Sequence, residues 1–100
     1  MSGYRLAPAA AADLEDIWLY SARTWSEAQA ERYIDALAAS FDTIAAMPEI
    51  GREHREFSPA IRIHPSGQHV ILYRIEAEGI SIYRVLGGRR NWRALPDLDG

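Results

Sequence analysis

Two stretches in the first half of the chain carry apolar residues at helical spacing. The first begins at Pro8, a residue suited to the first turn of a helix, and continues for about four turns. The second begins at Ser26, which has the form of a capping box with Gln29, and ends before Pro48. The two apolar stripes consist of Leu14, Ile17, Trp18 and Trp25, and of Ala30, Tyr33, Ile34, Leu37, Phe41 and Ile44. The pattern predicts a hairpin of two helices, the second about 20 residues long.

The second half of the chain changes to the alternation that is typical of strands. Ile61 and Ile63 alternate with polar residues, and a turn signal follows at residues 65–68. Residues 69–76 and 80–86 are rich in β-branched and aromatic side chains and are apolar on both faces. Such runs indicate central strands, whereas the segment around Ile61 is expected to have one wetter face.

Two remaining segments complete the predicted order of elements. Residues 4–6 form a short alternating segment before the first helix, and residues 49–58 lack periodicity and are predicted to be a connecting loop. The order β-α-α-β-β-β favours an α+β fold, in which the helical hairpin packs on one face of a small antiparallel sheet. The other sheet face is then left available. A chain of 100 residues has room for a single domain, which we expect to span residues 1–100.

The composition is that of an ordinary globular protein and excludes several classes of function. The chain is 48% hydrophobic and 25% charged, and it has no cysteine. Disulfides, zinc-thiolate sites and thiol nucleophiles are therefore excluded. No stretch approaches the roughly 18 to 20 apolar residues of a membrane span, and no secretory signal is visible at the start, so we expect a cytoplasmic protein. Two histidines without an adjacent carboxylate are too few ligands for a metal, and no cofactor is expected.

The charges are distributed unevenly along the chain. Residues 1–51 hold three Arg and eight Asp or Glu, and residues 52–100 hold eight Arg and six Asp or Glu, giving −5 and +2. All eleven basic residues are arginines, so no lysine can serve as a base. Residues 87–95 form a basic aromatic tail whose composition suits a phosphate backbone, a stacked base or an acidic protein groove.

The order and spacing of many residues resemble those of the ParE toxins, within the RelE/ParE superfamily. The resemblance runs from Tyr4 to about Arg93 and rests on Leu6-Ala7-Pro8-Ala9-Ala10, Asp13-Leu14, Ile17-Trp18, Tyr20, Trp25, Ala30, Tyr33, Pro48, Gly51-Arg52, Ile61-Arg62, His69 to Arg74, and Ile82 to Leu86. It implies a toxin of a bacterial type II toxin–antitoxin module with a ParD-type antitoxin. The ParE branch is known for poisoning DNA gyrase, whereas the RelE branch cuts mRNA on the ribosome.

The residues favour the gyrase branch but leave two alternatives open. RelE-type enzymes use lysines, arginines and a C-terminal tyrosine, whereas this chain has no lysine and its last tyrosine is Tyr83. We therefore expect a non-catalytic poison. A nuclease would depend on His64 and His69 as an acid–base pair, with the arginines Arg62, Arg84, Arg89 and Arg90 to steady the phosphate. The third possibility is an inactive, toxin-like module that binds an antitoxin and harms nothing.

Two sets of residues are predicted to contact partners. Target binding is assigned to the C-terminal arginines and tryptophan, namely Arg84, Arg89, Arg90, Trp92 and Arg93. Antitoxin binding is assigned to aromatic residues of the helical hairpin and two strand arginines, namely Trp18, Tyr20, Trp25, Tyr33, Arg62 and Arg74. Most of the aromatic residues are expected in the core, and any that are exposed would mark a groove for a partner helix. The toxin alone is not expected to bind DNA sequence-specifically.

Overall fold

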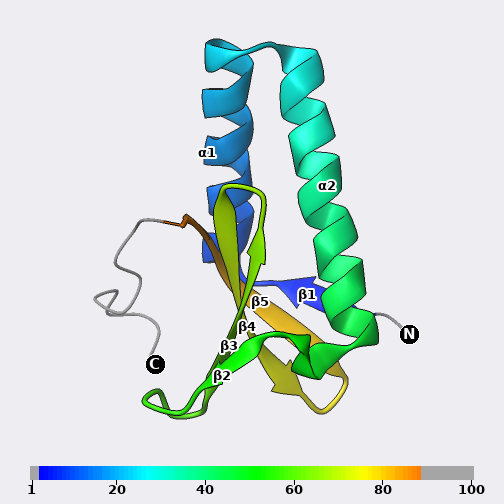
Figure 1. The fold of residues 1–100 in the computed structure, drawn as a ribbon, viewed down its shortest axis with the longest axis vertical. Coiled ribbons are helices and arrows are strands. Elements are labelled where there is room, and N and C mark those ends of the chain that lie inside the picture. The colour runs from blue at the N-terminus through cyan, green and yellow to red at the C-terminus, as the bar shows by residue number, and fades with distance from the viewer. Residues whose placement is uncertain (1–2, 89–100) are drawn as a thin grey trace.

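The computed structural model describes residues 3–88. The predicted helical hairpin has its turn at the top of Figure 1, and its second helix runs down from there to the level of the sheet. Helix α1 spans Pro8–Thr24 and helix α2 spans Glu27–Ala46. The side chain of Ser26 accepts a hydrogen bond from the Gln29 N–H at 3.0 Å, which confirms the predicted cap of α2. No helix among the described residues is long and apolar enough to cross a lipid bilayer.

Five strands form one sheet in the order β1-β5-β4-β3-β2, which confirms the predicted α+β fold. Their bounds are Tyr4–Leu6 for β1, Arg52–His54 for β2, Ile61–Ser66 for β3, His69–Glu76 for β4 and Gly79–Gly87 for β5. The sheet is mixed rather than purely antiparallel, because β1 lies parallel to β5 while all other pairs are antiparallel. The chain between β1 and β5 includes both helices and the other three strands, which is long enough for a parallel arrangement.

The segment predicted as a loop at residues 49–58 contains two short elements. A 3₁₀ turn spans Pro48–Ile50, and β2 pairs with the first three residues of β3 at the edge of the sheet. Strand β2 has the sequence Arg-Glu-His, without an apolar alternation. The prediction of an unbroken loop was wrong, because pairing with β3 rather than the segment's own pattern makes it a strand.

The main core lies between the helical hairpin and one face of the sheet. Its most buried members come from both helices and both central strands, and include Ile17, Leu37, Phe41, Ile44, Ile71, Tyr73, Ile82 and Val85. Figure 1 shows that the hairpin projects well beyond the β3–β4 turn. The distal ends of both helices therefore lie past the sheet.

The opposite face of the sheet is partly covered, contrary to the expectation that it would be left available. Phe57, from the segment between β2 and β3, is buried against Ile61, Leu72 and Leu86. Ile63 and Val70 pack against the same cluster. A long aromatic side chain in an otherwise polar segment thus forms a second, smaller core.

The turn at residues 48–51 is fixed to the sheet by polar side chains. The Tyr73 hydroxyl donates to the Pro48 carbonyl at 2.6 Å and accepts from the Gly51 N–H at 2.8 Å. The Arg62 guanidinium donates to the carbonyls of Glu49 and Gly51, at 3.2 and 2.8 Å. Burial raises the pKa of Tyr73, against the opposing effects of the Gly51 N–H and the nearby Arg62. The hydroxyl therefore remains a neutral donor and acceptor at physiological pH.

Candidate functional site: an aromatic groove beside the helical hairpin

A groove of about 290 Å³ lies between the helical hairpin and the β3–β4 turn. It is lined by Asp16, Ile17, Tyr20, Ser21, Trp25, Gln29, Tyr33, Gln68 and His69. Trp25 and Tyr20 have exposed fractions of 72% and 67%, the largest among the large apolar side chains of residues 3–88. Aromatic surface left in water at this level usually belongs to an interaction site.

Tyr33 and His69 connect α2 to the start of β4 at the floor of the groove. The Tyr33 hydroxyl lies 2.6 Å from His69 Nδ1 and accepts from the Gln68 N–H at 2.9 Å. The two rings are tilted by 57°, with centroids 5.4 Å apart. The turn that carries Gln68 includes Gly67, which has a φ of 59°. A Cβ at Gly67 would lie 2.8 Å from the Tyr33 hydroxyl, so α2 packs closely against this turn.

The environment of His69 favours the neutral imidazole. Burial lowers its pKa, and the carboxylate of Asp13 opposes that effect. Since the pKa of an unperturbed histidine is about 6.5, His69 is predominantly uncharged at neutral pH. Tyr33 and His69 therefore form a neutral hydrogen-bonding pair in the same groove as the exposed rings of Tyr20 and Trp25.

Asp13 joins α1 to β5 beside the groove. Its carboxylate accepts from Arg84 Nε and Nη2 at 2.8 and 2.9 Å, and also from the Val85 N–H at 2.9 Å. The side chains of Asp13 and Arg84 are only 12% and 15% exposed. Because β1 pairs with residues 80–82 alone, the Val85 N–H lies on an edge of β5 that β1 does not reach. The Asp13 carboxylate therefore accepts the hydrogen bond of this N–H at the strand edge and also balances the charge of Arg84.

The structure brings together three of the six residues assigned to antitoxin binding. Tyr20, Trp25 and Tyr33 line the groove, while Trp18 is half-buried on α1 and does not line it. Arg62 is bound to the main chain of the 48–51 turn. Arg74 is buried, with its guanidinium 4.8 Å from the centroid of the Tyr83 ring. The two arginines thus have structural contacts away from the groove.

The residues assigned to target binding and to RNA cleavage are not gathered in one described site. Arg84 is paired with Asp13, and residues 89, 90, 92 and 93 lie outside the described part of the chain. His64 and His69 occupy neighbouring strands, where His64 pairs in register with Ile71. His69 Nδ1 is bound to Tyr33. Among residues 3–88, no three His, Asp or Glu side chains are grouped closely enough to hold a metal ion.

Several groove residues were missed by reasoning from the sequence. Asp16, Gln29 and Gln68 line the groove, but polar residues on an exposed helix face or in a turn have no pattern that separates them from ordinary surface. The sequence pointed to His69 only for nuclease chemistry. Its contact with Tyr33, 36 residues away in the chain, depends on the packing of α2 against the β3–β4 turn.

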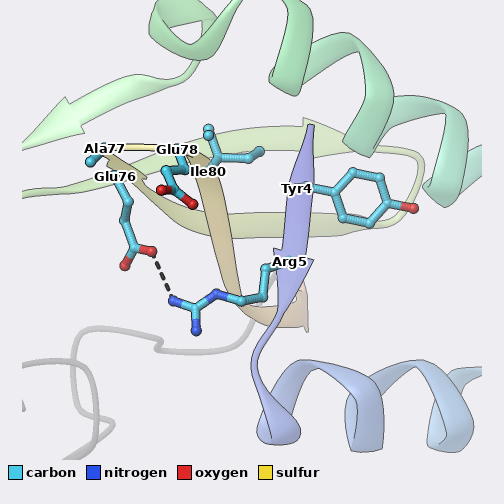
Figure 2. A pocket seen from close by; sticks show the side chains of 7 residues that line it. Tyr4, Arg5, Glu76, Ala77, Glu78 and Ile80 are labelled. Atoms are coloured by element: carbon cyan, nitrogen blue, oxygen red, sulfur yellow. Dashed lines mark hydrogen bonds and ion pairs between the residues drawn. The ribbon is translucent and has the colours of Figure 1, made fainter. Parts of the chain in front are cut away.

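A second hollow, of about 590 Å³, lies at the β4–β5 turn beside β1 (Figure 2). It is lined by Tyr4, Arg5, Glu76, Ala77, Glu78, Gly79 and Ile80. Arg5 and Glu76 form an ion pair at 2.8 Å, visible as the dashed line in Figure 2, with side chains 71% and 37% exposed. An exposed pair of this kind contributes little to affinity or stability. The aromatic groove is therefore the stronger candidate for an interaction site.

Comparison with known sequences places the chain among bacterial toxins. The family model described as "ParE toxin of type II toxin-antitoxin system, parDE" matches residues 4–92. The chain is 43% identical over 89 residues to Toxin ParE1 of Mycobacterium tuberculosis, covering 88% of this chain and 91% of the relative. It is 39% identical over 94 residues to Toxin ParE1 of Caulobacter vibrioides, covering 94% of this chain and 97% of the relative.

The fold agrees with that assignment. A solved structure described as "Chromosomal ParDE TA system from P. aeruginosa" is similar to this chain with a TM-score of 0.74. The match covers 87% of this chain and 96% of the other, at 17% sequence identity, a level at which the likeness concerns the fold alone. The match to the family over nearly the whole chain, together with the two ParE1 relatives, shows that this chain belongs to the ParE toxins of type II toxin–antitoxin systems.

Proposed function

We propose that this ParE-family chain is a cytoplasmic, non-catalytic poison of DNA gyrase that a ParD-type antitoxin silences. Membership of the family carries the proposal, and the description of the related solved structure as a ParDE system supports the partner. The antitoxin covers the aromatic groove, defined by the nine lining residues above. Trp25 and Tyr20 supply exposed aromatic area for an apolar partner segment, which is the kind of surface that a docked helix buries.

The contacts of the nuclease candidates support a non-catalytic mechanism. Arg62 is occupied by main-chain carbonyls, Arg84 by Asp13, and His69 by Tyr33. Phosphate cleavage needs an acid, a base and free cations directed at one reacting phosphate. Groups that serve to hold turns and strands together are poorly suited to those roles.

The target is tested by inducing the chain alone in bacteria and by adding the purified protein to gyrase. We expect growth arrest with a rising DNA-damage reporter, and loss of gyrase supercoiling activity in the purified reaction. The variant His64→Ala should poison gyrase and arrest growth as the parent does, because the proposed mechanism uses no histidine. If the parent cleaved mRNA and His64→Ala did not, the nuclease alternative would be established. If the parent did not impede growth, the silent module would be favoured.

Docking of the antitoxin in the groove is tested with Trp25→Ala. We expect the affinity for the cognate ParD-type protein to fall by about 10- to 100-fold, because central aromatic anchors contribute most of the binding free energy of such interfaces. Titration calorimetry provides the measurement. The matched control is Met47→Ala, which removes another exposed apolar side chain (54%) next to the far end of α2. Equal affinities for the two variants would contradict docking in the groove.

A further inference from the structure

We propose that His69 selects the antitoxin segment by donating a hydrogen bond from Nε2 to an uncharged acceptor on that segment. The acceptor would be a carboxamide, a hydroxyl or a main-chain carbonyl. This inference rests on the proposed docking of the antitoxin in the aromatic groove. It specifies the chemistry of the antitoxin group that faces His69. The observations that carry it are the contacts of the Tyr33 hydroxyl with Gln68 and His69, and the charges around His69.

The direction of hydrogen bonding at the floor determines which nitrogen of His69 is the donor. The Tyr33 oxygen accepts from the Gln68 N–H and lies 2.6 Å from His69 Nδ1, and we infer that the hydroxyl proton is donated to that nitrogen. An imidazole that accepts at Nδ1 and is neutral carries its proton on Nε2. No described residue accepts a hydrogen bond from Nε2, and His69 lines the groove. A docked segment that buried this N–H without an acceptor would lose the hydrogen bond that the group makes with water.

The charges around His69 favour an uncharged acceptor. From α1, Asp16 lines the same groove and Asp13 acts on the imidazole through space. From β5, the charge of Arg84 is balanced by Asp13, and from α2 the facing group is the Tyr33 hydroxyl. The β3–β4 turn contributes Gln68, which is neutral. A carboxylate on the antitoxin would be repelled by Asp16, whereas a carboxamide or carbonyl would accept from Nε2 without that cost.

Docking should also depend on pH, in a direction that identifies the acceptor. A docked antitoxin would cover the groove and bury His69 further, which disfavours the charged imidazolium. Binding to a neutral acceptor would therefore release the proton of any His69 that is protonated in the free toxin. Affinity would therefore be lost as the pH falls through the titration of His69. A carboxylate acceptor would reverse the sign, because it would be attracted to the imidazolium and affinity would rise as the pH falls.

Two substitutions at His69 distinguish the contribution of the Nε2 hydrogen bond to antitoxin affinity from that of the ring. His69→Gln places an amide N–H near the position of Nε2 and does not titrate, and His69→Phe keeps a ring but has no donor. With the complete chain and its cognate ParD-type protein, we expect His69→Phe to bind about 3- to 10-fold more weakly than the parent at neutral pH. His69→Gln should bind nearly as tightly as the parent. Thermal unfolding of each variant shows whether the toxin remains folded at the temperature of the titration.

The same titrations at about pH 7.5 and about pH 5.5 complete the test. The proposal requires the parent to bind more weakly at the lower pH. The affinity of His69→Gln should change less between the two pH values than that of the parent. Stronger binding of the parent at the lower pH, absent from His69→Gln, would overturn the uncharged acceptor. If His69→Phe bound as tightly as the parent while Trp25→Ala bound weakly, the inference would fail and docking in the groove would stand. If Trp25→Ala had no effect, both would fail.

Discussion

The variant Asp13→Ala is expected to lower the free energy of unfolding by about 3 to 5 kcal/mol, the cost of removing one partner of a largely buried ion pair. The Asp13 carboxylate accepts three hydrogen bonds, two from Arg84 and one from the Val85 N–H. Without it, the guanidinium loses its bidentate partner and the edge of β5 loses the acceptor that satisfies it. These contacts also join α1 to a strand 71 residues later in the chain.

Chemical denaturation followed by circular dichroism measures this loss, with Glu15→Ala as the matched control. Glu15 lies on the exposed face of the same helix, and its removal should change the free energy of unfolding by less than about 0.5 kcal/mol. Asp13→Asn should fall between the two, because the amide keeps an acceptor and loses the charge. Similar unfolding free energies for Asp13→Ala and Glu15→Ala would show that the ion pair contributes little.

The result bears on the assignment of Arg84 to target binding. An Arg84→Ala toxin that failed to arrest growth could have lost its fold rather than its contact with the target, because Arg84 is held by Asp13. Residual stability must therefore be measured beside toxicity for any variant of this pair. The proposal that Arg84 contacts the target requires loss of toxicity in a variant that remains folded.

The variant Tyr73→Phe is expected to lower the free energy of unfolding by about 2 to 4 kcal/mol. Tyr73 is fully buried, and its hydroxyl donates to the Pro48 carbonyl and accepts from the N–H of Gly51. Phenylalanine preserves the packing of the ring but leaves a buried N–H without its acceptor.

The control for this prediction is Tyr83→Phe, which makes the same chemical change on the adjacent strand. Tyr83 is half-buried, and its ring contact with Arg74 does not require the hydroxyl. We expect a change of less than about 0.5 kcal/mol in thermal or denaturant unfolding. If Tyr73→Phe were as stable as Tyr83→Phe, the 48–51 turn would not depend on the Tyr73 hydroxyl.

Much of the fold could be predicted because its elements have strong local patterns. The helical stripe from Leu14 to Trp25 records a helical periodicity, the cap at Ser26 marks a helix start, and residues 69–76 are rich in strand-forming side chains. Two successive helices followed by strands can bury their apolar faces together only in a few layer arrangements. The order of elements therefore predicted a helical hairpin packed on a sheet. The family resemblance also depends on the order and spacing of residues, and the family match confirms it.

The partners of individual side chains could not be predicted in the same way, because they depend on contacts between distant parts of the chain. The pattern shows Arg62, Arg74 and Arg84 only as strand arginines, whereas the fold places them against a turn, an aromatic ring and a carboxylate. Strand β2 likewise exists because β3 offers it hydrogen bonds.

The amino-acid sequence by itself determined the type of element at most positions, the α+β class and the family, because periodicity and spacing are local properties of the chain. Only the tertiary structure decided that Tyr20, Trp25 and Tyr33 share a groove with His69, and that Asp13 closes the edge of β5. The physical reason is that hydrogen bonds, ion pairs and exposure are set by the distance between atoms in space. Residues 36 and 71 positions apart become neighbours only when the helices pack on the sheet.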